Sequence, residues 1–130
     1  NRIALSMTYY TPAWCEQTVA KFRSGGFDIL QAKTFGEQGL LPPARHISDH
    51  GWDIDDELVI EAVRRLASEA PDAEAIVMTG GGARTLALTP ELESLSGLPV
   101  LATDTALYWA VARAIGVPIK GDLLGALSRV

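Results

Sequence analysis

The chain has 130 residues, of which 48% are hydrophobic and 21% charged, and its net charge at pH 7 is −5. This composition predicts a single globular domain over residues 1–130 and excludes an intrinsically disordered chain. The acidic balance, without any basic run, argues against nucleic acid as a partner. No apolar stretch is long enough to cross a bilayer and no secretory signal is visible, so we expect a cytoplasmic protein without a membrane partner.

Four short apolar runs alternate with segments of helical pattern. The expected strands are residues 3–7, 27–32, 75–78 and 98–102. Because these runs are apolar on both faces, they predict a parallel sheet with helices on both sides, which is an α/β fold. In such folds a ligand binds outside the carboxyl ends of the strands.

Capping residues mark where the helices between these strands begin and end. Thr11 followed by Pro12 predicts a helix that runs to about Ser24, where two glycines stop it. The later helices are expected to be capped by Asp53 or Asp55 and by Thr103 or Asp104, and Gly116 is expected to end the last one.

The polar segment 36–52 is long for a connection within a compact domain, which more often marks function or partner contact. It contains His46 and His50, four residues apart, with Asp49 between them, and this spacing hints at a metal pair. The segment shows no helical pattern and no further histidine, so a surface loop is the preferred interpretation and no metal site is expected.

A glycine-rich segment, Thr79 to Ala83, directly follows the third expected strand and precedes a helix start near Pro90. Three consecutive glycines leave their backbone N–H groups uncovered by side chains. Together with the N-terminus of a following helix, such groups bind a carboxylate, a phosphate or a developing oxyanion. The alternative interpretation is a tight strand-to-helix turn without a ligand.

Parallel strands would bring three segments to one edge of the sheet, namely 8–11, 79–83 and 103–105. All three are rich in hydroxyl groups or bare amides, none contains a histidine, and only the last contains a carboxylate. This edge is therefore expected to accept negative charge on a ligand.

Three segments resemble the second half of the maleate isomerase and arylmalonate decarboxylase family, which belongs to the aspartate/glutamate racemase superfamily. They are Thr8-Tyr9-Tyr10-Thr11-Pro12, Arg84-Thr85-Leu86 and the stretch from Gly97 to Trp109. The ectoine-utilisation branch is a further candidate. The resemblance implies two flavodoxin-like halves with the site between them. On that basis, and because Asn1 is not an initiator methionine, this chain is expected to be one half of a longer protein.

The family motif in this half resembles Ser-Cys-Thr-Asn-Leu-Arg-Thr-Leu, and Thr79 and Gly80 fall on its serine and cysteine. Residues 84–86 match the motif and residues 81–83 depart from it. A glycine cannot carry a thiol, so two-thiol racemase chemistry is excluded here and any catalytic cysteine must come from the other half. No catalytic residue is assigned in this chain.

The resemblance implies a cofactor-independent isomerase, decarboxylase or racemase that acts on a small carboxylate or dicarboxylate such as maleate. A non-catalytic anion-binding domain is the alternative, with a phosphate-binding flavodoxin-like module as its weaker version. Tyr10 matches a family tyrosine that helps to bind a substrate carboxylate, whereas Tyr9 replaces a proline. The expected substrate-binding residues are Tyr10, Thr11, Thr79, Gly80, Gly81, Gly82 and Ala83.

The only cysteine of the chain, Cys15, excludes an internal disulfide and a cysteine-rich metal site. It falls about one turn into the first expected helix, whose N-terminus could lower the pKa of the thiol. A small structural hydrophobe is the preferred interpretation. The resemblance also implies a missing half as partner, or a homo-oligomer, so we expect one exposed apolar face where it would dock.

Overall fold

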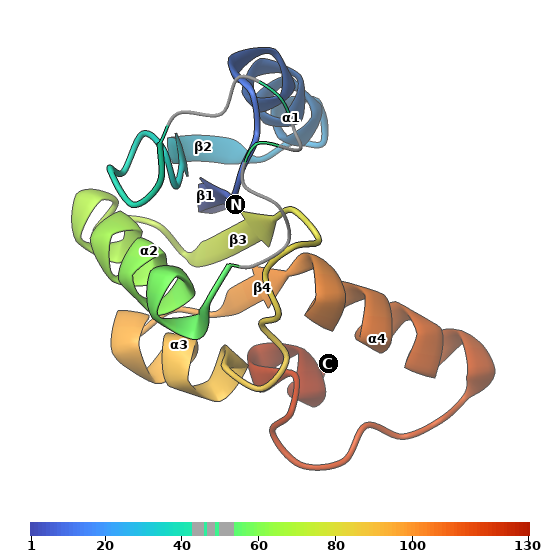
Figure 1. Ribbon diagram of the computed structural model, residues 1–130. Helices are drawn as coiled ribbons and strands as arrows, with labels where there is room; N and C mark the ends of the chain where they lie inside the picture. Colours follow the sequence, from blue (N-terminus) through green and yellow to red (C-terminus); the bar gives the residue numbers. More distant parts are fainter. Residues whose placement is uncertain (43–45, 47–48, 50–53) are drawn as a thin grey trace.

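A computed structural model describes residues 1–42, 46, 49 and 54–130. The described strands form one parallel sheet in the order β2-β1-β3-β4 (Figure 1). The strands are β1 (Arg2–Met7), β2 (Asp28–Thr34), β3 (Ala75–Thr79) and β4 (Val100–Ala102). The chain first adds β2 on one side of β1 and then adds β3 and β4 on the other side, with all strands parallel. This is the flavodoxin-like order, and the expected α/β fold is confirmed.

Helices connect the strands in the alternation that the sequence predicts. They are α1 (Pro12–Ser24), α2 (Asp56–Glu69), α3 (Thr89–Ser96) and α4 (Thr103–Ile115), with a final 3₁₀ turn η1 (Gly125–Arg129). The expected strand 98–102 is shorter in the structure. Leu98 donates its N–H to the Ser96 hydroxyl at 3.3 Å, and Pro99 has no N–H and contributes only its carbonyl, which accepts the Ile76 N–H at 2.9 Å.

Of the two predicted helix caps, the one at α2 is confirmed and the one at α4 is wrong. The Asp55 carboxylate caps α2 by accepting the Leu58 N–H at 2.9 Å, whereas Asp53 lies outside the described residues. The cap position of α4 is Ala102, so neither Thr103 nor Asp104 caps that helix. The reason is that the Thr105 hydroxyl already accepts the Ala102 N–H at 3.0 Å, which leaves the Asp104 carboxylate to bind elsewhere.

One face of the sheet is closed by α2 and α3, which lie together on one side of the strands in Figure 1. Val59, Val63 and Leu66 project from α2 at helical spacing and are at most 1% exposed. They pack with Leu92 of α3 and with Ile76 of β3 in the larger of two hydrophobic clusters. We call this side the closed face.

The other side of the sheet, which we call the open face, carries α1 and α4. Its cluster is small and is centred on Ile3, Leu5 and Ile29. None of the residues of α1 is buried, and Thr105 is the only buried residue of α4. A groove of about 380 Å³ runs between the two helices over β1, β3 and β4.

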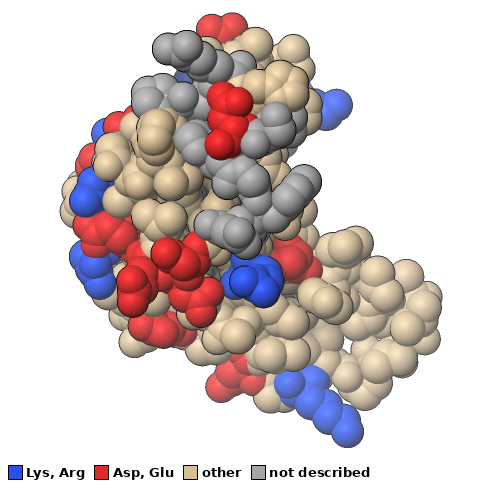
Figure 2. Space-filling view, viewed as in Figure 1, with Lys and Arg blue, Asp and Glu red and all other residues tan. Residues whose placement is uncertain are grey.

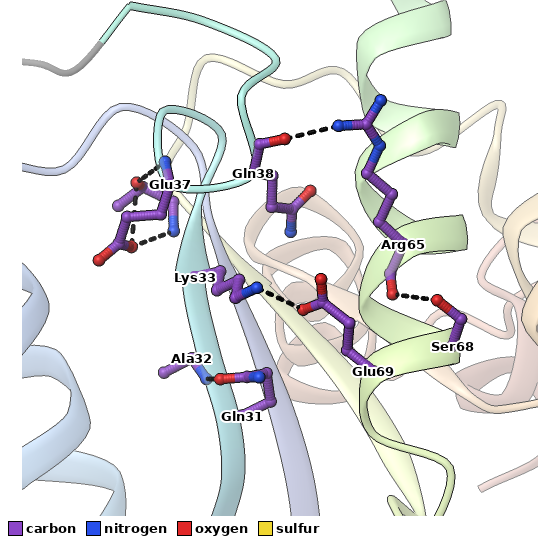
Figure 3. Close-up of polar contacts among 9 residues, drawn as sticks. Gln31, Ala32, Lys33, Glu37, Gln38, Arg65, Ser68 and Glu69 are labelled. Carbon is purple, nitrogen blue, oxygen red and sulfur yellow. Dashed lines mark hydrogen bonds and ion pairs between the residues drawn. The ribbon is translucent and has the colours of Figure 1, made fainter.

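Polar contacts fix α2 to the β2 edge of the sheet. Lys33 of β2 is paired with Glu69 of α2 at 2.7 Å, and Arg65 donates to the Gln38 carbonyl (Figure 3). The Glu37 carboxylate accepts the Thr34 N–H at 2.8 Å and so closes the turn that follows β2. Residues 36–41 of the long segment 36–52 thus form a turn beside α2.

Charge is distributed unevenly over the molecule. In the view of Figure 2, acidic side chains gather over the side that carries α2, whereas the arm formed by α4 shows a mainly uncharged surface. None of the helices in the described part of the chain combines the length and apolarity that a bilayer span requires. The acidic surface and the mainly uncharged helix α4 thus lie on different parts of the same small domain.

Candidate anion site

The carboxyl ends of the central strands meet where the sequence predicts a ligand-binding edge. The Thr8 N–H donates to the Thr79 carbonyl at 3.3 Å, which ties the loop after β1 to the end of β3. The Thr103 hydroxyl donates to the Met78 carbonyl at 3.4 Å, which ties the start of α4 to the same strand. The structure therefore brings the segments 8–11, 79–83 and 103–105 together, as expected.

Gly80 is the residue of the glycine segment whose conformation is most restricted. Its φ is +107°, in the region that side-chain-bearing residues rarely adopt. A Cβ at this position would lie 2.1 Å from the Thr8 hydroxyl oxygen. Position 80 is thus closed to a cysteine by backbone geometry and by Thr8, so the chain could not carry a thiol here without rearrangement.

Gly81 lies next in the chain but in different surroundings. A Cβ built on it would meet no atom within 4 Å, and its φ is not positive. Gly81 is exposed, whereas Gly82 and Ala83 are buried. The open side of the segment is therefore at Gly81, and a side chain there would project into the space through which a ligand could approach the amides.

The Tyr9 hydroxyl lies against the glycine segment. The backbone N–H groups of Gly81 and Gly82 are directed at its oxygen and lower its pKa. Burial raises the pKa of Tyr9 and the neighbouring Tyr10 hydroxyl raises it further, while the two amide bonds oppose the shift. Tyr9 therefore stays neutral at physiological pH, and two bare amides of the segment already hold an oxygen atom.

Tyr10, the tyrosine that the resemblance selects, points in another direction. Its ring contacts the Trp14 ring edge-on with centroids 5.5 Å apart, and it lines a surface groove along α1 with Lys21. Thr11 is half-buried at the cap position of α1 and makes no side-chain capping bond. A carboxylate contact by Tyr10 or Thr11 stays a prediction, since both follow β1 at the correct edge.

The only carboxylate of the three segments, Asp104, is bound by the protein itself. One of its oxygens accepts the N–H groups of Thr85 at 2.8 Å and Leu86 at 3.0 Å. The other accepts the Thr105 N–H at 2.9 Å and the Thr85 hydroxyl. The loop after β3 thus uses its far amides to bind an internal carboxylate, while its glycine amides hold only a neutral phenol.

The remaining candidates fall outside this arrangement. Burial raises the pKa of the Cys15 thiol to about 11, and the Glu37 carboxylate adds to the shift, so the helix N-terminus does not activate this cysteine. His46 and Asp49 form an exposed turn in which the His46 N–H donates to the Asp49 carboxylate at 2.8 Å. His50 lies outside the described residues, and the described ones contain no group of three potential metal ligands.

Sequence reasoning placed Thr8, Tyr9 and Asp104 at this edge but assigned none of them a contact or a role in the site. Strand alternation ends at Met7, so no periodicity could show which of the two following tyrosines faces the glycines. The contact of Asp104 with Thr85 spans 19 residues and depends on the pairing of β3 with β4. Only the position of Asp104 directly after a strand could have indicated a contact with the neighbouring loop.

Comparison with known proteins places this arrangement in a family. A sequence model of the arylmalonate decarboxylase family matches residues 44–127, more than half of the chain. The chain belongs to the arylmalonate decarboxylase family. An arylmalonate decarboxylase of Bordetella bronchiseptica is 32% identical over 90 residues, which are 65% of this chain and 38% of that protein. The residues matched by the family model include the whole glycine segment and Asp104.

Solved structures of two kinds share the fold. A maleate cis-trans isomerase of Nocardia farcinica bound to TRIS has 25% identity and a TM-score of 0.81, and covers 99% of this chain and 48% of its own. A crystal structure of arylmalonate decarboxylase has 24% identity and a TM-score of 0.79, with 98% and 53% covered. The chain of this family member thus spans about half the length of these relatives.

Proposed function

We propose that this chain supplies the carboxylate-holding half of the active site of a cofactor-independent isomerase, decarboxylase or racemase that acts on a small carboxylate or dicarboxylate such as maleate. The observation that carries the proposal is the convergence of the Gly81 and Gly82 amides on one oxygen, that of Tyr9. Two N–H groups directed at one point, at the carboxyl edge of a parallel sheet, can hold a carboxylate oxygen and stabilise the charge that develops on it.

Other groups at this edge complete the proposed binding site. The Thr79 hydroxyl is buried and has no hydrogen-bond partner in the part of the chain that the structure describes. It is the side chain just before Gly80, so it lies at the start of the amide segment. We include Thr79, Gly80, Ala83, Tyr10 and Thr11 as proposed ligands, and add Tyr9, whose hydroxyl already contacts the amides.

The catalytic thiol is proposed to come from a second half. A related maleate cis-trans isomerase has been solved as a cysteine-to-serine mutant with a covalently bound succinylcysteine intermediate, at 26% identity and a TM-score of 0.74. In an isomerisation the thiolate sulfur would bond to one alkene carbon, and the π electrons would move into the carboxylate that the amides hold. Rotation about the resulting single bond and loss of the thiolate would then give the other isomer.

The second half is proposed to dock on the open face. The exposed fractions of Leu107, Val111 and Ile115, all on α4, are 61%, 49% and 67%. The same helix contributes Thr103 and Ala106 to the apolar groove that lies over the sheet between α1 and α4. An apolar surface of this extent marks an interaction site in most proteins, and the relatives are about twice as long as this chain.

Binding of maleate to the full-length protein tests the site. We expect calorimetry to detect maleate at millimolar concentration or below, and Gly81→Val to abolish the signal without lowering the melting temperature substantially. Tyr9→Phe is expected to weaken binding by roughly 1–3 kcal/mol, the cost of removing a hydrogen bond to a charged acceptor. Tyr10→Phe tests the second tyrosine among the proposed ligands, whose ring contacts Trp14 of α1, and a smaller loss than for Tyr9→Phe would assign the main contact to Tyr9.

Turnover separates the enzyme from the anion-binding alternative. If the protein is an isomerase, proton NMR of maleate incubated with the full-length protein will show fumarate. If it is a decarboxylase, incubation with arylmalonate will release carbon dioxide and form the arylacetate product. Binding without turnover of either compound would favour a non-catalytic domain. No binding of maleate, arylmalonate or phosphate at millimolar concentration would show that the glycine segment is only a turn. The cytoplasmic location expected from the sequence stays a prediction.

A further inference from the structure

We propose that Asp104 is a positioning residue that holds the glycine segment in its anion-binding conformation. The inference rests on the function proposed above, because it assigns to Asp104 an effect on the ligand that the segment is proposed to bind. Its basis is a cluster of four hydrogen bonds to one carboxylate, with two donors on each oxygen. Three of those donors belong to the loop after β3, and the fourth belongs to α4 itself.

The glycine segment is held at both ends. At its start, the Thr79 carbonyl accepts the Thr8 N–H, and at its far end Thr85 is bound by Asp104. Thr85 is 1% exposed, and its carbonyl accepts the N–H groups of Leu88 and Thr89 at 2.9 Å each. Because Thr85 is immobilised on both sides, the residues between Thr79 and Thr85 have few ways to rearrange, although three of them are glycines.

The carboxylate chemistry suits this task and would not suit a ligand contact. Asp104 lies in the first turn of α4, where the helix dipole favours a negative charge, and it faces only donors. Charge-assisted bonds of this type are stronger than those between neutral groups. Removing the carboxylate would release the Thr85 and Leu86 N–H groups and let the loop, including the two amides that hold the Tyr9 oxygen, move apart.

Electrostatic repulsion alone predicts the opposite change in affinity when Asp104 is removed, because the ligand is an anion. A negative charge close to the site repels a dicarboxylate, so its removal would strengthen binding if Asp104 acted only through its charge. If Asp104 acts by positioning, its removal weakens binding instead. The direction of the change in affinity therefore distinguishes the two roles. If Asp104 affected only stability, its removal would leave the affinity of the folded protein unchanged.

Two readouts on the full-length protein test the proposal. We expect Asp104→Ala to increase the hydrogen-exchange rates of the Thr85 and Leu86 amides, whether or not any ligand binds. We also expect it to weaken maleate binding by about tenfold or more, as measured by calorimetry on the folded fraction. Asp104→Asn should lie between wild type and Asp104→Ala, because an amide oxygen can still accept two of the four donors while its NH₂ group cannot accept any.

Asp56→Ala is the matched control. Asp56 is also a carboxylate in the first turn of a helix, but it is exposed, and none of the described hydrogen bonds or ion pairs involves it. It should leave both readouts as in wild type. Unchanged exchange of the Thr85 and Leu86 amides in Asp104→Ala, or tighter maleate binding, overturns the proposal. If wild type binds no maleate, the proposed function fails, while amide exchange still decides whether Asp104 holds the loop.

Discussion

The two faces of the sheet use apolar side chains in different ways. On the closed face, the apolar residues of α2 and α3 meet those of the strands and are almost wholly buried. On the open face, α1 has no buried residue, and the large apolar side chains of α4 project from the protein. The difference teaches that one face is a complete core, whereas the other leaves large apolar side chains exposed.

The same contrast appears on a smaller scale in the glycine segment. Gly80 turns toward Thr8, where the structure has no space for a further atom, and Gly81 turns toward open space. Glycine is required at the first position by packing and by backbone conformation. At the second, a side chain would meet only open space, so packing does not require glycine there.

The largest effect is expected for Leu66→Ala on the closed face. Leu66 is 0% exposed and lies at the centre of the larger cluster, so its truncation leaves a cavity that the surrounding residues fill only in part. We expect a loss of about 2–5 kcal/mol in the free energy of unfolding, measured by urea denaturation. A loss below about 1 kcal/mol would mean that this face is not a rigid core.

Gly80→Ala comes next and is compared with Gly81→Ala. The added Cβ of Gly80→Ala meets the Thr8 oxygen and forces a positive φ on alanine, so we expect a loss of roughly 1–3 kcal/mol from overpacking, with backbone strain added. Gly81→Ala should be neutral in stability within about 0.5 kcal/mol. Equal melting temperatures for the two variants would contradict the contrast between these glycines.

Leu107→Ser on α4 tests whether the open face is covered in the full-length protein. If a second half docks there, the substitution should cost about 1.5–3 kcal/mol, which is the contribution of burying one leucine side chain. Leu95→Ser is the control, because Leu95 is 40% exposed on α3 at the closed face. Denaturation of both variants would decide, and an equal, near-zero loss would mean that α4 stays exposed.

The smallest effect is expected for Cys15 on α1. Since burial raises the pKa of its thiol to about 11, the thiol should react slowly with iodoacetamide at pH 7 and faster as the pH approaches 11. The sign for stability follows, because the thiol of the unfolded chain ionises near pH 9 and that of the folded chain does not. Its contribution is present below pH 9 and is lost as the pH rises through about 11.

Cys15→Ala provides the comparison for both measurements. It should leave maleate binding within a few-fold of wild type and should flatten any loss of stability above pH 9. Rapid alkylation of Cys15 at pH 7 that maleate prevents would show that the thiol lies in a binding site, contrary to its assignment as a structural residue.

The sequence alone determined the alternation of strands and helices, the parallel sheet and the edge at which a ligand would bind. These features depend on local patterns: apolar runs such as residues 75–78, the glycines that follow them, and a cap such as Asp55. Helix and strand periodicity, together with the short reach of a capping side chain, make such features readable within a few residues. The resemblance to the family was carried by the same local segments.

Tertiary structure alone decided which side chains meet at that edge. Whether Tyr9 or Tyr10 faces the amides depends on how the chain turns after β1, and the restriction of Gly80 depends on Thr8, which is 72 residues earlier in the sequence. The role of Asp104 arises because pairing of β3 with β4 places α4 beside a loop. Contacts of this kind follow from the packing of distant segments, for which no periodicity exists in the sequence.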